Sequence, residues 1–161
     1  MQGPKFKTTL LNETAGGWQL AFLANIHTGF PYSLLTGTDQ SLSAVSLDRP
    51  DIVPQVNQYV RNKKTLVWTN PAAFVANAPG TFGTTRYNSL IAPAYFDFDT
   101  TLMKSFRITE RQHFDFRAEF FNVFNHTNLS APVTSRSSAN FGVIQASNPA
   151  RIIQLAGKYT F

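Results

Sequence analysis

Strict alternation of apolar and polar residues is the feature that most constrains what this chain can fold into. In one segment, Phe114 and Phe116 alternate with Asp115 and Arg117. Successive side chains of a strand point to opposite faces, so a period of two predicts strands with one aromatic face and one charged face. The alternation runs through four segments, at residues 17–27, 96–107, 112–125 and 150–161.

The composition limits where such strands can lie. Charged residues make up 14% of the chain, against roughly 25% in a typical soluble domain. The 161 residues include 15 Phe and no Cys, and the absence of Cys excludes disulfides, cysteine-based zinc sites and thiol catalysis. The net charge of +5 is spread along the chain, with one tight basic group at residues 61–64. We therefore expect no nucleic-acid partner. The apolar faces indicate a protein with much of its surface out of water.

The connections between the segments alternate in length. A short polar turn, Ile108–Arg111, joins the second and third segments, and another turn signal, NETAGG, precedes the first. Long polar stretches at residues 28–95 and 126–149 join the others. If Phe161 lies at the periplasmic rim, every short turn falls on that side and every long loop on the other. Short periplasmic turns and long outer loops are typical of outer-membrane barrels, whereas long structureless loops are uncommon in compact soluble domains.

The predicted fold is all-β, an antiparallel up-and-down transmembrane β-barrel segment. Its aromatic face meets lipid, although Lys104 interrupts that face near the end of its strand. Its polar face meets a watery lumen, with charges that we expect to pair across strands. Asp97 and Asp99 are expected to join a charge network with the basic residues. The lumen-facing candidates are Asp97, Asp99, Arg107, Asp115, Arg117, Glu119 and Lys158.

Four strands do not close a barrel, since the smallest membrane barrels have eight. At most two short strands can be added, at residues 31–36 and 140–145. The chain is therefore interpreted as the last four to six strands of a larger barrel. Residues 1–16, which lack the apolar region of a signal peptide, form a periplasmic turn or the remnant of a preceding strand. Residues 17–161 form the barrel segment, with outer loops at about 37–95 and about 126–150.

Several short motifs in a fixed order resemble one known family. They are GGWQL at 16–20, TGFPYS at 28–33, DRPDIV at 48–53, the long stretch from WTNPAAF to SFRITER at 68–111, FRAEFFNVFNHTNL at 116–129 and NFGVI at 140–144. Together they resemble the C-terminal end of TonB-dependent receptor-like outer-membrane proteins of the Oar-like, acidobacterial subgroup. The resemblance implies a barrel of about 22 strands with an N-terminal plug. This chain shows no plug, TonB box or regulatory-like domain, so contact with the TonB complex is expected only through a plug outside it.

The resulting function hypothesis is part of a receptor or transporter barrel in the outer membrane of a Gram-negative cell, taking up or binding an unidentified ligand. We expect no metal, because the three histidines lack metal-ligand spacing. We expect no enzyme activity or cofactor, because the sequence has no G-x-S-x-G motif and no glycine-rich phosphate loop. Expected partners are outer-membrane lipid and the assembly machinery. Leu155, Tyr159 and Phe161 resemble the C-terminal signal that this machinery reads. Candidate ligand contacts in the outer loop are Tyr59, Trp68, Phe74 and Tyr87.

Two alternatives stay open at this point. The chain is a soluble β-sandwich binding module of the carbohydrate-binding type if its aromatic faces pack between two sheets. It is an outer-membrane barrel hydrolase if catalytic residues gather at the loop ends, where His126 is the single candidate.

Overall fold

The computed structural model describes residues 16–161, which form two compact units. The first, here called the sheet unit, contains residues 16–26, 96–127 and 149–161. The second, here called the loop unit, contains residues 27–95 and 128–148. The periplasmic turn expected at residues 1–16 lies outside the described residues, except for Gly16. Each unit is described by itself.

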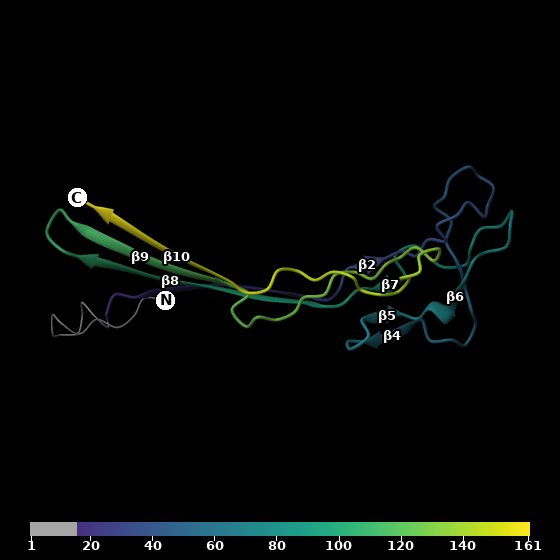
Figure 1. Cartoon of the computed structure of the whole chain (residues 1–161), viewed down its shortest axis with the longest axis horizontal. Helices are drawn as coiled ribbons and strands as arrows, with labels where there is room; N and C mark the ends of the chain where they lie inside the picture. The colour runs from purple at the N-terminus through teal and green to yellow at the C-terminus, as the bar shows by residue number, and fades with distance from the viewer. Residues whose placement is uncertain (1–15) are drawn as a thin grey trace. The chain divides into compact units, whose positions relative to one another are not determined.

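The sheet unit is built on the four long strands that the alternation predicts. They are β1 (Gln19–His27), β8 (Tyr95–Arg107), β9 (His113–Phe121) and β10 (Ile152–Thr160), in the spatial order β1-β8-β9-β10. Figure 1 shows β8, β9 and β10 side by side. β8 pairs with β9, and β9 with β10, in antiparallel register. Trp18 contacts Phe106 while Phe22 contacts Phe98, so β1 also runs antiparallel to β8. The sheet of the described residues is open and does not close on itself.

The third strand ends earlier than the sequence predicts. β9 stops at Phe121, whereas the alternation continues to Asn125. Asn122 and Asn125 adopt φ angles of 52° and 51°, the left-handed conformation that asparagine tolerates better than most residues. Two such residues turn the chain out of the extended conformation. Phe124 nevertheless packs on Phe98, with 5.5 Å between ring centroids, so it stays with the aromatic face.

Register assigns the side chains to the faces that the alternation predicts. Leu102 lies opposite Ala118, and Ala118 lies opposite Leu155, so one face is apolar across three strands. Thr101 lies opposite Glu119, and Glu119 lies opposite Gln154, on the other face. The two faces are called the apolar face and the charged face below.

The loop unit contains short paired segments. They are β2 (Pro31–Tyr32) with β7 (Leu90–Ile91), β3 (Asp51–Ile52) with β6 (Phe74–Val75), β4 (Tyr59–Asn62) with β5 (Val67–Thr69), and the single-turn 3₁₀ helix η1 (Pro71–Ala73). The optional strands at 31–36 and 140–145 are therefore not members of the long sheet. The first is reduced to β2, and in the second Val143 makes an isolated bridge to Val67.

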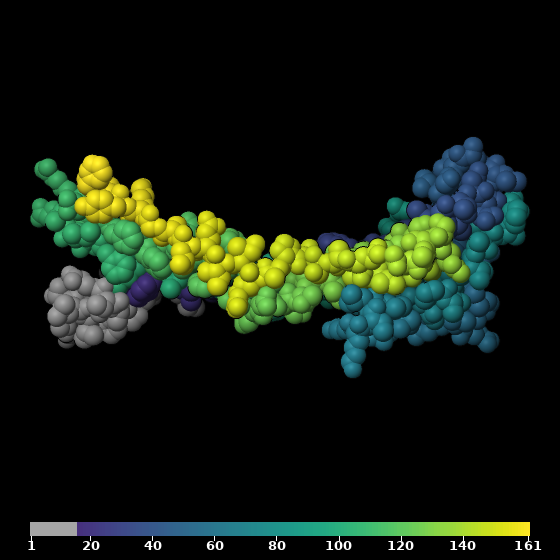
Figure 2. Space-filling view, in the orientation of Figure 1, coloured from purple at the N-terminus to yellow at the C-terminus, as the bar shows by residue number. Residues whose placement is uncertain are grey.

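The two long connections meet in a common core, although nothing in their sequence is periodic. Leu34 and Phe74 are fully buried, and Phe141, from the other connection, packs edge-on against Phe74 at 6.2 Å. Gly142 accepts hydrogen bonds from the backbone N–H groups of Trp68 and Thr69 at 2.8 and 3.1 Å. Gly142 has φ +79°, and a Cβ there would lie 2.4 Å from the Thr69 carbonyl oxygen, so this contact requires glycine. In Figure 2 the yellow-green stretch lies against the blue and teal one.

Candidate functional site

A row of aromatic rings crosses all four strands near the β8–β9 turn. Trp18 contacts Phe106 at 6.4 Å between ring centroids, and Phe106 contacts Phe114 at 6.3 Å. Phe114 lies opposite Tyr159 in register, and Tyr159 stacks on Phe161 at 6.2 Å. These residues lie at one level of the apolar face, as an aromatic girdle at a membrane interface does.

A second aromatic group lies at the opposite end of the same face. Phe22 stacks on Phe98 at 5.7 Å, and Phe124 contacts both Phe98 and Phe96. Phe98 and Phe106 are eight residues apart on β8, which is roughly 27 Å along a strand. A strand tilted by about 40° then separates the two aromatic levels by roughly 21 Å, close to the ~25 Å apolar band that two girdles flank in outer-membrane barrels.

The apolar face is open to its surroundings. Phe22, Ile26 and Leu155 are 59%, 66% and 67% exposed. A β-sandwich would bury these side chains between two sheets, so the exposure opposes the soluble binding-module alternative. A continuous apolar face of this size marks contact with lipid or another partner.

No helix within residues 16–161 is both long enough and apolar enough to span a bilayer.

Lys104 interrupts the apolar pattern of β8, and its side chain packs among aromatic rings. Its side chain is almost fully buried, at 4% exposed, among aromatic rings. The Nζ atom lies 4.8 Å from the centroid of Phe106 and 5.1 Å from that of Trp18. An ammonium group over ring faces is attracted by their electron density. Lys104 therefore joins the aromatic row, at the level where cationic side chains reach the interface.

The charged face carries pairs that the register brings together. Lys158 lies directly opposite Asp115, and the Arg117 guanidinium forms an ion pair with Glu119 two residues further along β9. Arg107, at the same end of β8, lies opposite His113. Cross-strand and same-strand pairing explains these side chains without a ligand.

Asp99 lies far from Arg107, with which a charge network was expected. Arg107 is eight residues from Asp99 on the same strand, roughly 27 Å away. Asp99 instead accepts a hydrogen bond from the backbone N–H of Asn122 at 2.9 Å, where β9 has just ended. The carboxylate thus stabilises the turn that follows β9.

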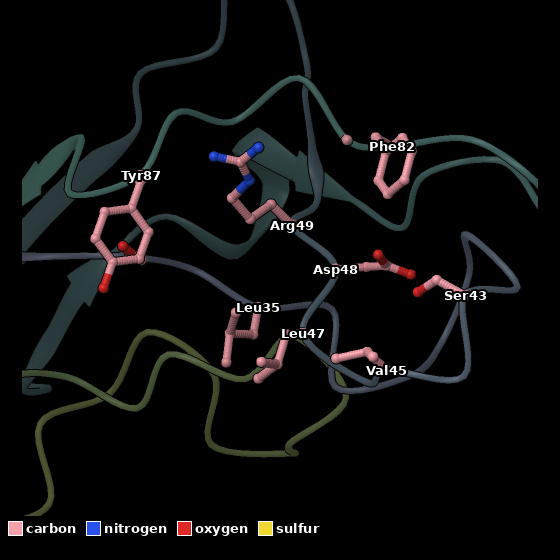
Figure 3. A pocket seen from close by; sticks show the side chains of 10 residues that line it. Leu35, Ser43, Val45, Leu47, Asp48, Arg49, Phe82 and Tyr87 are labelled. Atoms are coloured by element: carbon pink, nitrogen blue, oxygen red, sulfur yellow. The ribbon is translucent and has the colours of Figure 1, made fainter.

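A cavity of about 570 Å³ opens in the loop unit, within the connection from β1 to β8 (Figure 3). Such a volume is typical of small-molecule sites. Leu35, Val45 and Leu47 line one side, and the exposed rings of Phe82 and Tyr87 line others. The remaining lining residues are Ser33, Ser43, Asp48, Arg49 and Gly83. This cavity is called the loop pocket below.

One of the four ligand contacts expected from the sequence, Tyr87, lines the loop pocket. Phe74 is fully buried in the core of the loop unit, where a ligand has no access to it. The Tyr59 hydroxyl accepts a hydrogen bond from the Ile91 N–H, and the Trp68 indole N–H donates to the Ile91 carbonyl. Tyr59, Trp68 and Phe74 therefore stabilise the loop unit. Arg49 and Phe82, which the sequence reasoning missed, carry no periodic signal and are recognised only from their place in the fold.

Among the residues that the structure describes, Tyr32 and Asp48 have shifted pKa values, and both lie in the loop unit. Burial raises the pKa of Tyr32 from 10.0 to about 12, although its hydroxyl is hydrogen-bonded to the Thr69 hydroxyl at 2.7 Å. The backbone N–H of Ser41 donates to the Asp48 carboxylate at 2.6 Å and, with further donors, lowers the pKa of Asp48. Asp48 is therefore ionised at neutral pH and already has hydrogen-bond partners.

The remaining candidates from the sequence are the C-terminal residues and His126. Leu155 and Tyr159 lie on the apolar face, and Phe161, directly after β10, is 90% exposed. The His126 ring packs edge-on against Phe96 at 5.5 Å, and its backbone N–H donates to the Asn122 side chain. Within residues 16–161, no group of three or more His, Asp or Glu side chains is placed to hold a metal ion.

A twisted antiparallel sheet with a bilayer-sized apolar face, flanked by two aromatic levels and backed by a charged face, defines an outer-membrane β-barrel protein. A sequence comparison agrees: the family model described as an outer membrane beta barrel domain matches residues 2–154. The chain belongs to this family, and it resides in the outer membrane. No curated protein and no solved structure matches the chain.

Proposed function

We propose that this chain forms the closing strands of a TonB-dependent receptor-like barrel, which binds an unidentified ligand at its outer loops and takes it up. The carrying observation is that both long connections leave the sheet at the same strand ends and fold into one body with a pocket. Short connections between neighbouring strands are enough to close a barrel. A folded loop body is instead suited to recognition, since binding residues concentrate on loops held by a rigid scaffold.

The charged face supplies the lumen in this proposal. Lys158, Asp115, Arg117 and Glu119 then line a watery passage, which they keep hydrated. The last strand, β10, closes the barrel against its first strand. Leu155, Tyr159 and Phe161 present the C-terminal signal to the assembly machinery. Coupling to the TonB complex requires a plug, as the resemblance to the receptor family implies.

The topology is tested by cysteine labelling in intact cells, which the absence of native cysteine makes simple. Lys63→Cys lies in the loop unit, and Glu110→Cys lies in the turn between β8 and β9; both native side chains are exposed. A membrane-impermeant maleimide is expected to label Lys63→Cys from outside and Glu110→Cys only after the outer membrane is permeabilised. Equal labelling of both in intact cells would contradict the proposed orientation.

The receptor identity is tested separately by the genomic DNA upstream of the Met1 codon. An in-frame segment encoding a plug, preceded by a regulatory-like domain, is expected. A stop codon directly upstream, with no plug encoded, would leave an outer-membrane barrel segment but remove energy-coupled uptake.

A further inference from the structure

The loop pocket has two preformed walls. The Thr84 N–H donates to the Asp51 carboxylate at 2.9 Å, and the Thr84 hydroxyl accepts from the Ile52 N–H at 3.0 Å. The Thr85 N–H donates to the Pro50 carbonyl at 3.1 Å. These bonds join residues 50–52, directly after Arg49, to residues 84–85, which lie between Phe82 and Tyr87 in the chain, so Arg49 and the two rings are carried by joined segments. Gly83 permits the contact, since a Cβ there would lie 1.7 Å from the Arg49 carbonyl oxygen.

Two charged side chains line the pocket, Asp48 and Arg49, and they differ in their hydrogen-bond partners. The Asp48 carboxylate accepts the Ser41 N–H at 2.6 Å. The Arg49 side chain is half-buried in the pocket wall, and no hydrogen bond or ion pair joins its guanidinium to another residue within the described chain. A guanidinium in a partly apolar cavity favours a carboxylate, sulfonate or phosphate partner, which it binds through paired N–H groups.

The rest of the lining indicates the body of the ligand. Leu35, Val45 and Leu47 offer an aliphatic surface, while Phe82 and Tyr87 are 76% and 72% exposed. In the view of Figure 3, the Arg49 guanidinium lies between these two rings. Exposed rings stack on flat apolar groups. Asp48 would repel a second anionic group at its end of the pocket.

We propose that the loop pocket binds a small amphiphile with a single anionic group, held by Arg49, and an apolar ring body, held between Phe82 and Tyr87. This inference rests on the proposed receptor function and gives its ligand class. It differs from the barrel's contact with lipid, because the pocket lies in the loop unit and is built from one connection.

The test uses two fluorescent probes that differ in one group. Anilinonaphthalene sulfonate carries a sulfonate, and phenylnaphthylamine is its uncharged counterpart. Each is titrated onto the assembled protein in lipid nanodiscs, with empty nanodiscs subtracted. Saturable binding is expected for both, with the anionic probe bound more tightly. Arg49→Gln is expected to raise the Kd of the anionic probe at least ~10-fold and to leave that of the neutral probe within about twofold.

Matched variants keep the result interpretable. Arg86→Gln removes a neighbouring exposed arginine that does not line the pocket, and it should leave both Kd values unchanged. Tyr87→Ala removes an exposed ring, so it should weaken both probes alike without unfolding the loop unit. Equal losses from Arg49→Gln and Arg86→Gln, or an equal loss for both probes in Arg49→Gln, would overturn the proposal. The titration measures probe binding and the cysteine labelling measures orientation in the membrane. A negative titration therefore rejects the pocket proposal without affecting the labelling result, and a negative labelling result rejects the proposed orientation without affecting the titration.

Discussion

An arginine substituted at either of two neighbouring positions of β8 tests which face of the sheet meets lipid. Leu102 lies on the apolar face opposite Ala118, and its neighbour Thr101 lies on the charged face opposite Glu119. Leu102 is five residues from the end of β8 at Arg107, roughly 17 Å along the strand. With a tilt of about 40°, that is roughly 13 Å along the membrane normal, close to the midplane of a ~25 Å apolar band.

At that depth Leu102→Arg is expected to cost about 2–4 kcal/mol in free energy of unfolding, a shift of ~30-fold or more in the folded-to-unfolded ratio. Thr101→Arg is expected to change stability by less than about 1 kcal/mol, because the new charge meets water and Glu119. Urea titration of the assembled protein in lipid vesicles measures both. Equal losses in the two variants, or a larger loss in Thr101→Arg, would refute the assignment of the apolar face to lipid.

Three further predictions concern the loop unit and the C-terminus. Phe74→Ala should cost about 3–5 kcal/mol of local stability, seen as faster amide exchange across the loop unit, whereas the exposed Phe82→Ala should be nearly neutral. Because burial raises the pKa of Tyr32 to about 12, the loop unit keeps its full stability below pH ~10 and loses about 2–3 kcal/mol as the pH rises to ~12. Alkaline unfolding measures this loss, and Tyr32→Phe should abolish it; an unchanged slope would contradict the cause. Deleting Phe161 should lower the outer-membrane level of the protein in fractionated cells, whereas Phe161→Tyr should retain it; normal levels after the deletion would remove the signal.

The long strands were predictable because their pattern is local. The alternation alone assigns each residue of β8 to the apolar or the charged face, so the faces of Phe98 and Asp99 are predicted without knowledge of the neighbouring strand. The early end of β9 could also have been predicted from the sequence. Asn122 and Asn125 are residues that favour left-handed turns, but the alternation continuing to Phe124 outweighed them in the prediction.

The loop unit was not predictable by the same reasoning. Its core joins Leu34, Phe74, Leu90 and Phe141, which share no period and come from two connections. The pocket depends on which of these residues pack inward. Phe74 and Phe82 are the same residue type in similar polar stretches, yet one is fully buried and the other 76% exposed. The difference arises from tertiary contacts such as that of Phe141 with Phe74.

The bridge between Leu35 and Ser135 has a consequence for the order of biogenesis. It closes a loop of about 100 residues, which costs roughly 2–3 kcal/mol more chain entropy than the five-residue turn between β8 and β9. The β8–β9 hairpin can therefore form early, while the loop unit must wait until both of its connections, as far as Ser135, are available to fold. During that interval β8 and β9 are paired, but the pocket walls lack the support that residues 128–148 give to the loop unit. Recognition would then be the last property the protein acquires.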